Sequence, residues 1–447
     1  MMTHSTVWLA ELQFFISLSF MAIFFALELG LSWVLFIFRV RTLGRAGPVW
    51  MGAYRTWARI FAIAFVLSLA ASIPVLILLG SLWPKFLSAT TVLSSPFLAA
   101  IIVTTLIFKS SFLSLMLYAH RRLPGWLHGV AVGLVALLNT LIMVLLLAWV
   151  SWVHYPVGAT WSEGVLQSVK WATVFSQPLF FWYLILFAGA SFLLVGVFIQ
   201  AVVFWQSIRR PADEGDRRTF RLSLVLSIGA WLALFLAAWG HGLWLSEHQA
   251  QKAAALSGYW ETASSPKWLI AAWSDEHQQM HRFSLGFRLK TTPWLALNEQ
   301  QDYVGLDKAV GMLPPVNIVF WAFRFVLLLG LLVGFWQLRT FWLVVRRHFD
   351  PGALSIRWRR FSVFMPFFAA LLLFFGLSYQ LLGVLPYAVF NVVTTNDIYA
   401  HLPLGWLTVG SLVAALIYLL STVGFLSLTR YVARHGVIPV ARHRGRA

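Results

Sequence analysis

Nine apolar stretches, each long enough to cross a membrane as a helix, constrain the fold of this chain more than any other feature. They lie near residues 9–38, 58–80, 95–119, 127–152, 178–206, 220–245, 316–343, 361–385 and 404–430. A helix of about 20 apolar residues spans the roughly 30 Å of hydrocarbon in a bilayer. The sequence therefore predicts an all-α polytopic membrane protein with nine transmembrane helices.

Composition excludes several other classes of protein. The mean hydropathy is +0.79, and 24 Trp and 38 Phe accompany only 11% charged residues, which is too apolar for one soluble core. The net charge of +18 would suit a nucleic-acid binder, but the basic residues lie between apolar stretches rather than on one soluble face. We therefore expect a lipid membrane and no nucleic acid as its surroundings. The lack of cysteine excludes disulfides and thiolate-ligated cofactors.

Arginines cluster in alternate connections between the apolar stretches. Most of the 33 Lys and Arg fall within 39–59, 121–122, 209–221, 339–360 and 430–446. The intervening connections hold few basic residues, such as Lys85 and Lys170. Because cytoplasmic loops carry the excess of Lys and Arg, this pattern predicts an outside N-terminus and a cytoplasmic C-terminus in a cell inner (plasma) membrane. The first stretch lacks a cleavage signal and is expected to be a retained helix.

One membrane domain with one water-facing insertion is the expected organisation. Residues 1–245 carry helices one to six, residues 246–315 form an insertion outside the membrane, and residues 316–447 carry helices seven to nine with a basic tail. The insertion contains an alanine-rich segment that predicts a short helix over Gln249–Trp260, followed by a break at Ser264–Pro266.

Three ionisable residues lie inside predicted helices, where charge is costly and is by default a sign of function. They are Glu28 in the first helix, Lys109 in the third and Arg324 in the seventh. Glu28 and Lys109 either form a buried structural pair or serve a proton or ligand role. Arg324 is near enough to a helix end to reach the outer interface.

No histidine lies in the middle of a predicted helix, although haem ligation inside a bundle needs inward-facing ligands. His154 and His241 lie near the outer ends of helices four and six. Histidines such as these are candidate ligands of a haem near the outer surface, and the alternative is that they are solvated residues at helix ends.

Short motifs along nearly the whole chain occur in the order seen in a known family. They are Leu12-Gln13-Phe14 with Gly30, Gly80 with Trp83, Ser151-Trp152 with Tyr155-Pro156-Val157-Gly158, Glu247-His248-Gln249 with Lys252 and Gly258-Tyr259-Trp260-Glu261-Thr262, Phe320-Trp321-Ala322-Phe323-Arg324, and Gly383-Val384-Leu385-Pro386. With nine helices and a long loop between helices six and seven, the chain resembles the haem-bearing subunit I of cytochrome bd quinol oxidases. The resemblance implies that family's bundle and a respiratory complex with a second membrane subunit, similar to bd subunit II, or other redox subunits.

The motif that begins at Glu247 resembles the family's quinol-loop motif, so the insertion corresponds to the loop where family members bind and oxidise quinol. A quinone site needs a hydrogen-bonding group for each quinone oxygen and an apolar or aromatic wall. His248, Gln249 and Lys252 can supply the polar groups and Trp260 the wall, so these four are candidate quinone-binding residues. The alternative is an exposed amphipathic helix on the outer ends of the bundle, with Trp260 as an interface anchor.

The haem-ligand positions of the family hold other residues in this chain. The resemblance places its haem-ligating residues at Met21, Leu186 and Val326, two functional glutamates at Ile101 and Lys109, and the quinol-loop glutamate at Ser257. Leucine and valine have no lone pair for iron, and one methionine is a poor substitute for histidine. Haem b and haem d, which the family implies, are therefore not expected to bind in the family's manner, and we assign no metal site and no catalytic residue.

Three hypotheses about function follow. The first is a haem-less scaffold or quinone-contacting subunit of a respiratory electron-transfer complex, which is not catalytic alone. The second is an active quinol:oxygen oxidoreductase subunit whose haem ligands have moved to residues such as His154 or His241. The third, a transporter on the same scaffold, is weaker, because the helices lack an obvious pair broken by Gly or Pro.

Overall fold

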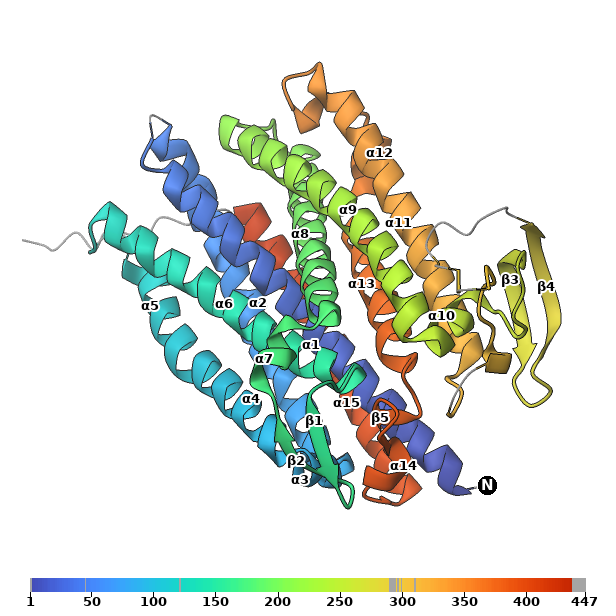
Figure 1. Ribbon diagram of the computed structural model, residues 1–447. Coiled ribbons are helices and arrows are strands. Elements are labelled where there is room, and N and C mark those ends of the chain that lie inside the picture. Colours follow the sequence, from blue (N-terminus) through green and yellow to red (C-terminus); the bar gives the residue numbers. More distant parts are fainter. Residues whose placement is uncertain are drawn as a thin grey trace, which may run out of the picture.

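The computed structural model describes residues 2–44, 46–119, 122–288, 295, 297–298, 300–308 and 311–435 (Figure 1). Within this part of the chain, nine helical segments are long and apolar enough to cross a membrane, as predicted. They are α1 (Met2–Arg41), α2 (Gly47–Leu82), α4 (Thr91–Val103) continued by η1 (Thr104–Lys109) and α5 (Ser110–Tyr118), α6 (Gly125–His154), α8 (Pro178–Ser207), α9 (Glu214–His248), α11 (Val316–Val345), α12 (Ile356–Ser362) with α13 (Met365–Leu382), and α15 (Leu404–His435).

Short elements connect these segments. The helices among them are α3 (Pro84–Ala89), α7 (Trp171–Ser176), α10 (Ala250–Ser257), α14 (Thr395–Ile398), and the 3₁₀ turns η3 (Leu306–Lys308) and η4 (Pro351–Ala353). Three antiparallel hairpins pair β1 (Ala159–Ser162) with β2 (Val165–Val169), β3 (Lys267–Asp275) with β4 (Met280–Arg288), and β5 (Tyr387–Val389) with β6 (Val393–Thr394). The hairpins were not predicted, but they are minor additions to an all-α fold.

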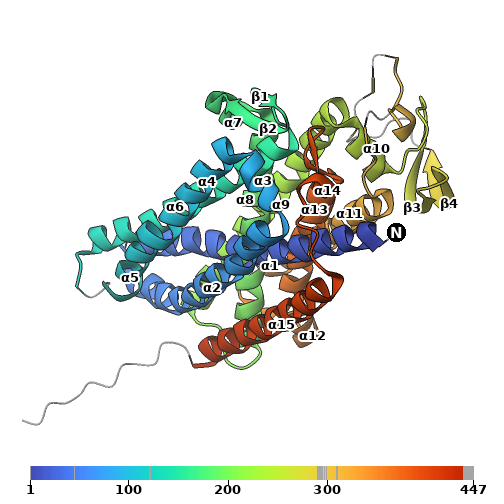
Figure 2. The same ribbon diagram turned by 90° about the horizontal axis from the view of Figure 1, so that it is seen from below.

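Helices α1 and α8 form the centre of the bundle, and each buries 67% of its most apolar window. Figure 2 shows α1 running between α6 on one side and α15 on the other, and it also packs against α2, α8 and α13. Gly30 allows the close approach of α1 and α8, because a Cβ there would lie 2.6 Å from Val195 Cγ2 and 3.0 Å from Ser191 O. Small residues at such crossings let helix backbones pack closely in a membrane.

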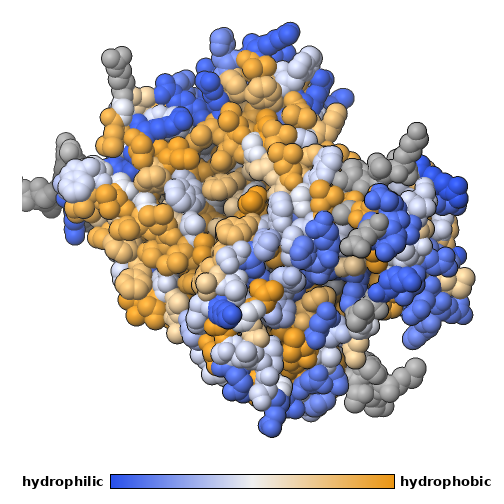
Figure 3. Space-filling view, viewed as in Figure 1, coloured by the Kyte–Doolittle hydropathy of each residue, from blue (hydrophilic) through white to orange (hydrophobic). Residues whose placement is uncertain are grey.

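The two ends of the bundle differ in character. We call the end that carries the N-terminus, the three hairpins and α10 the loop end, and the opposite end, with the arginine-rich connections, the basic end (Figure 1). A broad apolar surface lies between hydrophilic side chains at these ends (Figure 3). Arg45, Arg121 and the arginines after residue 435 lie outside the described residues.

Two local predictions need correction. Helix α10 covers Ala250–Ser257 rather than Gln249–Trp260, because Gly258 adopts a left-handed conformation with φ +77° and ends it. The segment is also not an exposed amphipathic helix, since every residue from Gln251 to Ser257 is buried. Its alanines are small enough for it to pack tightly against α9 and α11.

Candidate functional site

Six buried polar side chains meet at the loop end of the bundle, and we call them the loop-end cluster. Its members are His154 on α6, Tyr183 on α8, His241 on α9, Lys252 on α10, and Tyr379 and Gln380 on α13. The most exposed of them, Gln380, shows only 8% of its surface to solvent. Polar groups buried to this degree need one another as hydrogen-bond partners, so the cluster specifies how five helices meet.

Lys252 reaches from α10 to the C-terminal end of α13. Its Nζ donates to Gln380 O at 2.9 Å and to Gln380 Oε1 at 2.7 Å. The last carbonyls of a helix lack intrahelical donors and carry partial negative charge, which favours a cation at this position. Gly383 leaves room for the lysine stem, because a Cβ there would lie 3.0 Å from Lys252 Cε.

The Gln380 amide connects the rest of the cluster. Tyr183 Oη donates to Gln380 Oε1 at 3.3 Å, and His154 Nδ1 lies 2.6 Å from Tyr183 Oη. Gln380 Nε2 donates to Tyr379 Oη at 2.8 Å and lies 3.3 Å from His241 Nδ1. A hydrogen-bonded chain therefore runs from Lys252 through Gln380 and Tyr183 to His154.

Burial lowers the pKa of Lys252 from 10.5 to about 7. None of the ion pairs among the described residues includes this lysine, so no carboxylate offsets the lowering of its pKa by desolvation. A group with a pKa near 7 exchanges protons readily at neutral pH, and such groups are concentrated at functional sites. The lysine is thus the member of the cluster best suited to accept or release a proton.

This lowered pKa makes the stability of the protein depend on pH. Above pH 7 the unfolded chain retains a proton on Lys252 that the folded protein has lost, so the free energy of unfolding rises with pH until about 10.5. Between pH 7 and pH 9 the contribution of Lys252 is expected to rise by about 2 kcal/mol. Thermal midpoints of wild type and Lys252→Met, measured in nanodiscs at pH 7, 8 and 9, check this.

The comparison with Lys252→Met isolates this lysine, because His154, His241, Tyr183 and Tyr379 remain in both proteins. We expect the difference in stability between wild type and variant to move in favour of wild type as the pH rises. A difference that stays constant over this range would show that Lys252 keeps an ordinary pKa.

The four candidate quinone-binding residues contact different neighbours. Lys252 is a member of the loop-end cluster, and Gln249 lies beside the cluster, because its Nε2 donates to His154 O at 2.6 Å. Trp260 Nε1 instead donates to Ser274 Oγ on β3 at 3.1 Å. His248 stacks on Trp244 with ring centroids 4.6 Å apart.

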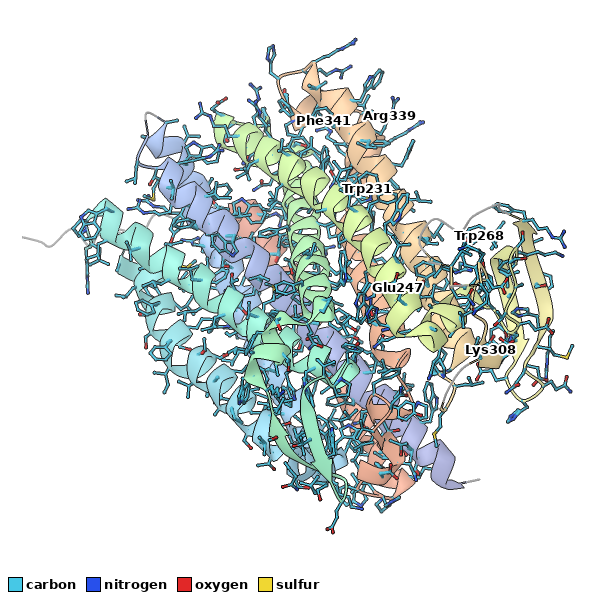
Figure 4. All side chains as sticks on the ribbon, in the orientation of Figure 1. Trp231, Glu247, Trp268, Lys308, Arg339 and Phe341 are labelled. Atoms are coloured by element: carbon cyan, nitrogen blue, oxygen red, sulfur yellow. The ribbon has the colours of Figure 1, made fainter. Side chains whose placement is uncertain are left out.

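Arg324 fastens the insertion to the bundle. Its Nη1 donates to Leu256 O at 2.9 Å and its Nε donates to Leu269 O at 2.8 Å. Its guanidinium also lies 4.1 Å from the centroid of the Phe320 ring and 5.5 Å from that of Trp268. Figure 4 labels Trp268, which lies on the β3–β4 hairpin near α11. The arginine thus binds the ends of α10 and β3 to α11 rather than reaching solvent.

A cavity of about 680 Å³ lies between α1, α2, α4, η1 and α6, and we call it the apolar cavity. Apolar side chains form most of its wall. Three of the residues that line it are Met21, Ile101 and Lys109, which the resemblance assigns to positions of functional residues in the family. His154 also lines it and so joins the cavity to the loop-end cluster.

Lys109 and Glu28 form an ion pair beside the deep part of the apolar cavity. Lys109 Nζ lies 2.9 Å from Glu28 Oε1, and the side chains are 3% and 0% exposed. The contact is electrostatic rather than a well-aligned hydrogen bond, because neither Glu28 oxygen has a hydrogen bond of good geometry among the described residues. Lys109 Nζ also lies 4.9 Å from the centroid of the Phe65 ring.

The other positions that the resemblance assigns to functional residues of the family hold Leu186, Val326 and Ser257. Leu186 is half-buried on α8, and Val326 on α11 packs against an apolar cluster that includes Tyr379. Ser257 is buried at the end of α10. Of the three residues that the resemblance assigns to haem-ligand positions, only Met21 carries an atom able to ligate iron, so on this assignment they do not fit the family's three haems.

Lys252 and Gln249 were predicted from the sequence as quinone-binding residues and lie at the loop-end cluster, whereas Tyr183, Tyr379 and Gln380 were given no role. Two signals were available. Tyr183 lies one helical turn before Leu186 and therefore on the same face of α8. Gln380 lies just before the motif that begins at Gly383.

Comparison with known proteins gives a consistent result. The family model for cytochrome bd terminal oxidase subunit I matches residues 9–437. Cytochrome bd ubiquinol oxidase subunit 1 of Bacillus subtilis is 22% identical over 400 residues, covering 87% of this chain and 84% of that protein. Cytochrome bd-II ubiquinol oxidase subunit 1 of Escherichia coli is 23% identical over 285 residues, covering 62% and 54%. The structure of bd oxidase from Geobacillus thermodenitrificans matches with a TM-score of 0.83 at 16% identity, covering 96% of this chain and 99% of that one.

Proposed function

The chain belongs to the cytochrome bd terminal oxidase subunit I family, and from this premise we propose that it is a quinone-contacting subunit of a respiratory complex that does not hold haem at the family's ligand positions. As a member of this family with nine apolar helices among its described residues, it is a multi-pass protein of the bacterial inner membrane. The curated relatives are named as ubiquinol oxidase subunits, which supports a quinone as the small molecule that it meets.

The observation that carries the proposal is the set of side chains at the family's ligand positions. Leu186 and Val326 cannot donate electrons to iron, and Met21 has no partner ligand at the positions that the family uses. Lys109 replaces a functional glutamate and is already neutralised by Glu28 at 2.9 Å. A haem in the apolar cavity would therefore lack the family's axial ligands.

A second membrane subunit is part of the proposal. Subunit I of this family works in a complex with a subunit II, and we expect a similar or other redox subunit beside this chain. The redox centres would then lie in the partner subunit. This chain would supply a structural scaffold, the contacts to quinone and the loop-end cluster.

The haem content of the purified protein tests this proposal. In a pyridine haemochrome assay on the isolated chain, expressed with a haem precursor supplied, we expect far less than one haem per chain. A b-type membrane cytochrome purified in the same detergent serves as the control for haem retention. Stoichiometric haem b or haem d would overturn the proposal.

One observation favours the alternative of relocated ligands. His154 lines the apolar cavity, and its Nδ1 is held by Tyr183, which is how ligating histidines are commonly oriented. If haem is found, His154→Ala and His241→Ala separate the two candidates, because only the variant that removes a ligand changes the haem spectrum.

A further inference from the structure

We propose that the apolar cavity is a binding site for a lipid-soluble quinone, with the quinone ring beside His154 and the isoprenoid chain along α1. The inference rests on the proposed function, because it names the place where this chain would contact quinone. This place lies inside the bundle and not on the surface of the 246–315 insertion.

The shape of the apolar cavity suits a long molecule. Its lining extends along α1 from Glu11 to Phe25 and along α2 from Ser68 to Trp83. At 1.5 Å per residue, the lining on α1 is about 21 Å long. The volume of about 680 Å³ is within the range of ligand pockets. A compact ligand would leave much of this length empty, whereas a ring with an attached chain occupies it.

The cavity opens toward the lipid between α2 and η1. Ile73 and Leu76 on α2 line the cavity and are 53% and 43% exposed, and Leu106 on η1 is 54% exposed. Helices α2 and α4 make little direct contact, so their cavity-lining faces do not close against each other. The π-helical turn η1 continues this wall to Lys109, and such turns are frequent at functional sites. A lipid-soluble molecule therefore enters from the bilayer without crossing water.

The loop end of the cavity offers hydrogen-bonding groups for a quinone ring. His154 Nδ1 is occupied by Tyr183, while Nε2 makes no hydrogen bond within the part of the chain that the structure describes. Glu11, Tyr387 and Thr395 line the same end, and Thr395 Oγ1 donates to Glu11 Oε1 at 2.5 Å. Imidazole and hydroxyl groups are suitable partners for quinone oxygens.

Flat aromatic walls flank these polar groups. Trp83, Phe86 and Trp149 line the loop end of the cavity. The rings of Phe86 and Trp149 lie with their centroids 6.3 Å apart and an interplanar angle of 24°. Such surfaces favour a planar ring over a flexible head group.

The charges around the cavity disfavour a phospholipid. Lys109 is the only lysine or arginine among the described residues of the lining, and it lies at the deep end in an ion pair with Glu28. The loop end instead carries the Glu11 carboxyl group. A phosphate beside a carboxyl group and without a cation would be unfavourable, so the cavity selects an uncharged head group.

The position of His154 links this site to the loop-end cluster. Since Tyr183 Oη donates to Gln380, His154 Nδ1 donates to Tyr183 and Nε2 is an acceptor, so a hydroxyl of the reduced quinone that donates to Nε2 would sit at one end of the hydrogen-bonded chain through Tyr183 and Gln380 to Lys252. A hydrogen bond between the ring and His154 is thus connected, through this chain of hydrogen bonds, to the buried Lys252 of the insertion.

Quinone extracted from the purified protein tests the inference. The full chain is purified from host membranes in detergent, the organic extract is analysed for quinone and phospholipid by chromatography and mass spectrometry, and haem is measured on the same sample. We expect about one quinone per chain in wild type. Ile101→Trp fills the cavity wall and is expected to lower the quinone content about tenfold, which corresponds to about 1.4 kcal/mol.

Ile107→Trp is the matched control, because Ile107 lies on the same helical segment but is 58% exposed and does not line the cavity. It is expected to keep the wild-type quinone content. His154→Ala is a second test that removes bulk instead of adding it, and we expect it to lower the quinone content as well. Size-exclusion chromatography verifies that each variant is folded before extraction.

The outcomes separate failure of this inference from failure of the proposed function. Phospholipid without quinone, an equal loss of quinone in the Ile101 and Ile107 variants, or no bound molecule in a haem-free protein overturns the inference alone. Stoichiometric haem overturns the proposed function and the inference with it.

Discussion

Replacing Lys109 with methionine is expected to lower the free energy of unfolding by about 3–5 kcal/mol, because it leaves the Glu28 carboxylate buried without a counter-charge. Lys109 Nζ is 2.9 Å from Glu28 Oε1, and Glu28 is completely inaccessible to solvent. Water therefore cannot take the place of the lysine. Thermal unfolding in nanodiscs, followed by fluorescence-detected size-exclusion chromatography, measures the loss.

The double variant Lys109→Met/Glu28→Met shows whether the loss comes from the pair. Removal of both charges leaves no buried ion, so we expect stability close to wild type or above it. Lys85→Met is the control for the substitution itself, because Lys85 is exposed at the loop end and makes none of the ion pairs among the described residues. Additive effects of the two single substitutions would show that Glu28 and Lys109 act independently.

Replacing Arg324 with methionine is expected to loosen the insertion from the bundle. The substitution leaves Leu256 O and Leu269 O without their donor, and each unpaired buried carbonyl costs about 1–3 kcal/mol. It also removes the cation from the Phe320 ring, 4.1 Å away. These contacts join α10 and β3 to α11. Their loss is therefore expected to make local opening of the insertion more favourable.

Limited trypsin digestion measures this opening. Cleavage at Lys267 and Arg282 in the β3–β4 hairpin is expected to speed up by about tenfold or more, since a cost of 1.4 kcal/mol already changes an opening equilibrium tenfold. Arg339→Met is the matched control on the same helix. Arg339 projects from the basic end of α11 and lies 4.7 Å from the centroid of the Trp342 ring (Figure 4). Equal cleavage rates in the two variants would contradict an anchoring role for Arg324.

The bundle could be predicted because membrane helices are specified locally. Each apolar stretch must satisfy its own backbone hydrogen bonds in lipid, so length and hydropathy alone indicate a helix. Element ends were less certain, since they depend on local backbone conformation. Gly258, for example, ends α10 at Ser257 through its left-handed φ of +77°.

The candidate site was predictable only where a motif marked it. Lys252 and Gln249 belong to the segment that resembles the quinol-loop motif, and the structure brings both to the loop-end cluster. The insertion appeared water-facing from its composition, but Lys252 is 1% exposed. The reason is that Gly383 and the open carbonyls at the end of α13 create a place for the lysine, and they are distant in sequence.

The membrane helices and the alternation of basic connections could be predicted from the sequence, because each is a property of residue types at given positions. The replacement of the family's ligands at Met21, Leu186 and Val326 remains a prediction from the resemblance. Three features became visible in the folded protein alone: the pairing of Glu28 with Lys109, the connection of His154 to Lys252 through Tyr183 and Gln380, and the apolar cavity beside them. These features depend on the rotation of each helix about its axis and on its neighbours. A hydropathy pattern specifies that a helix lies in the membrane, but it does not specify which of its faces meets which other helix.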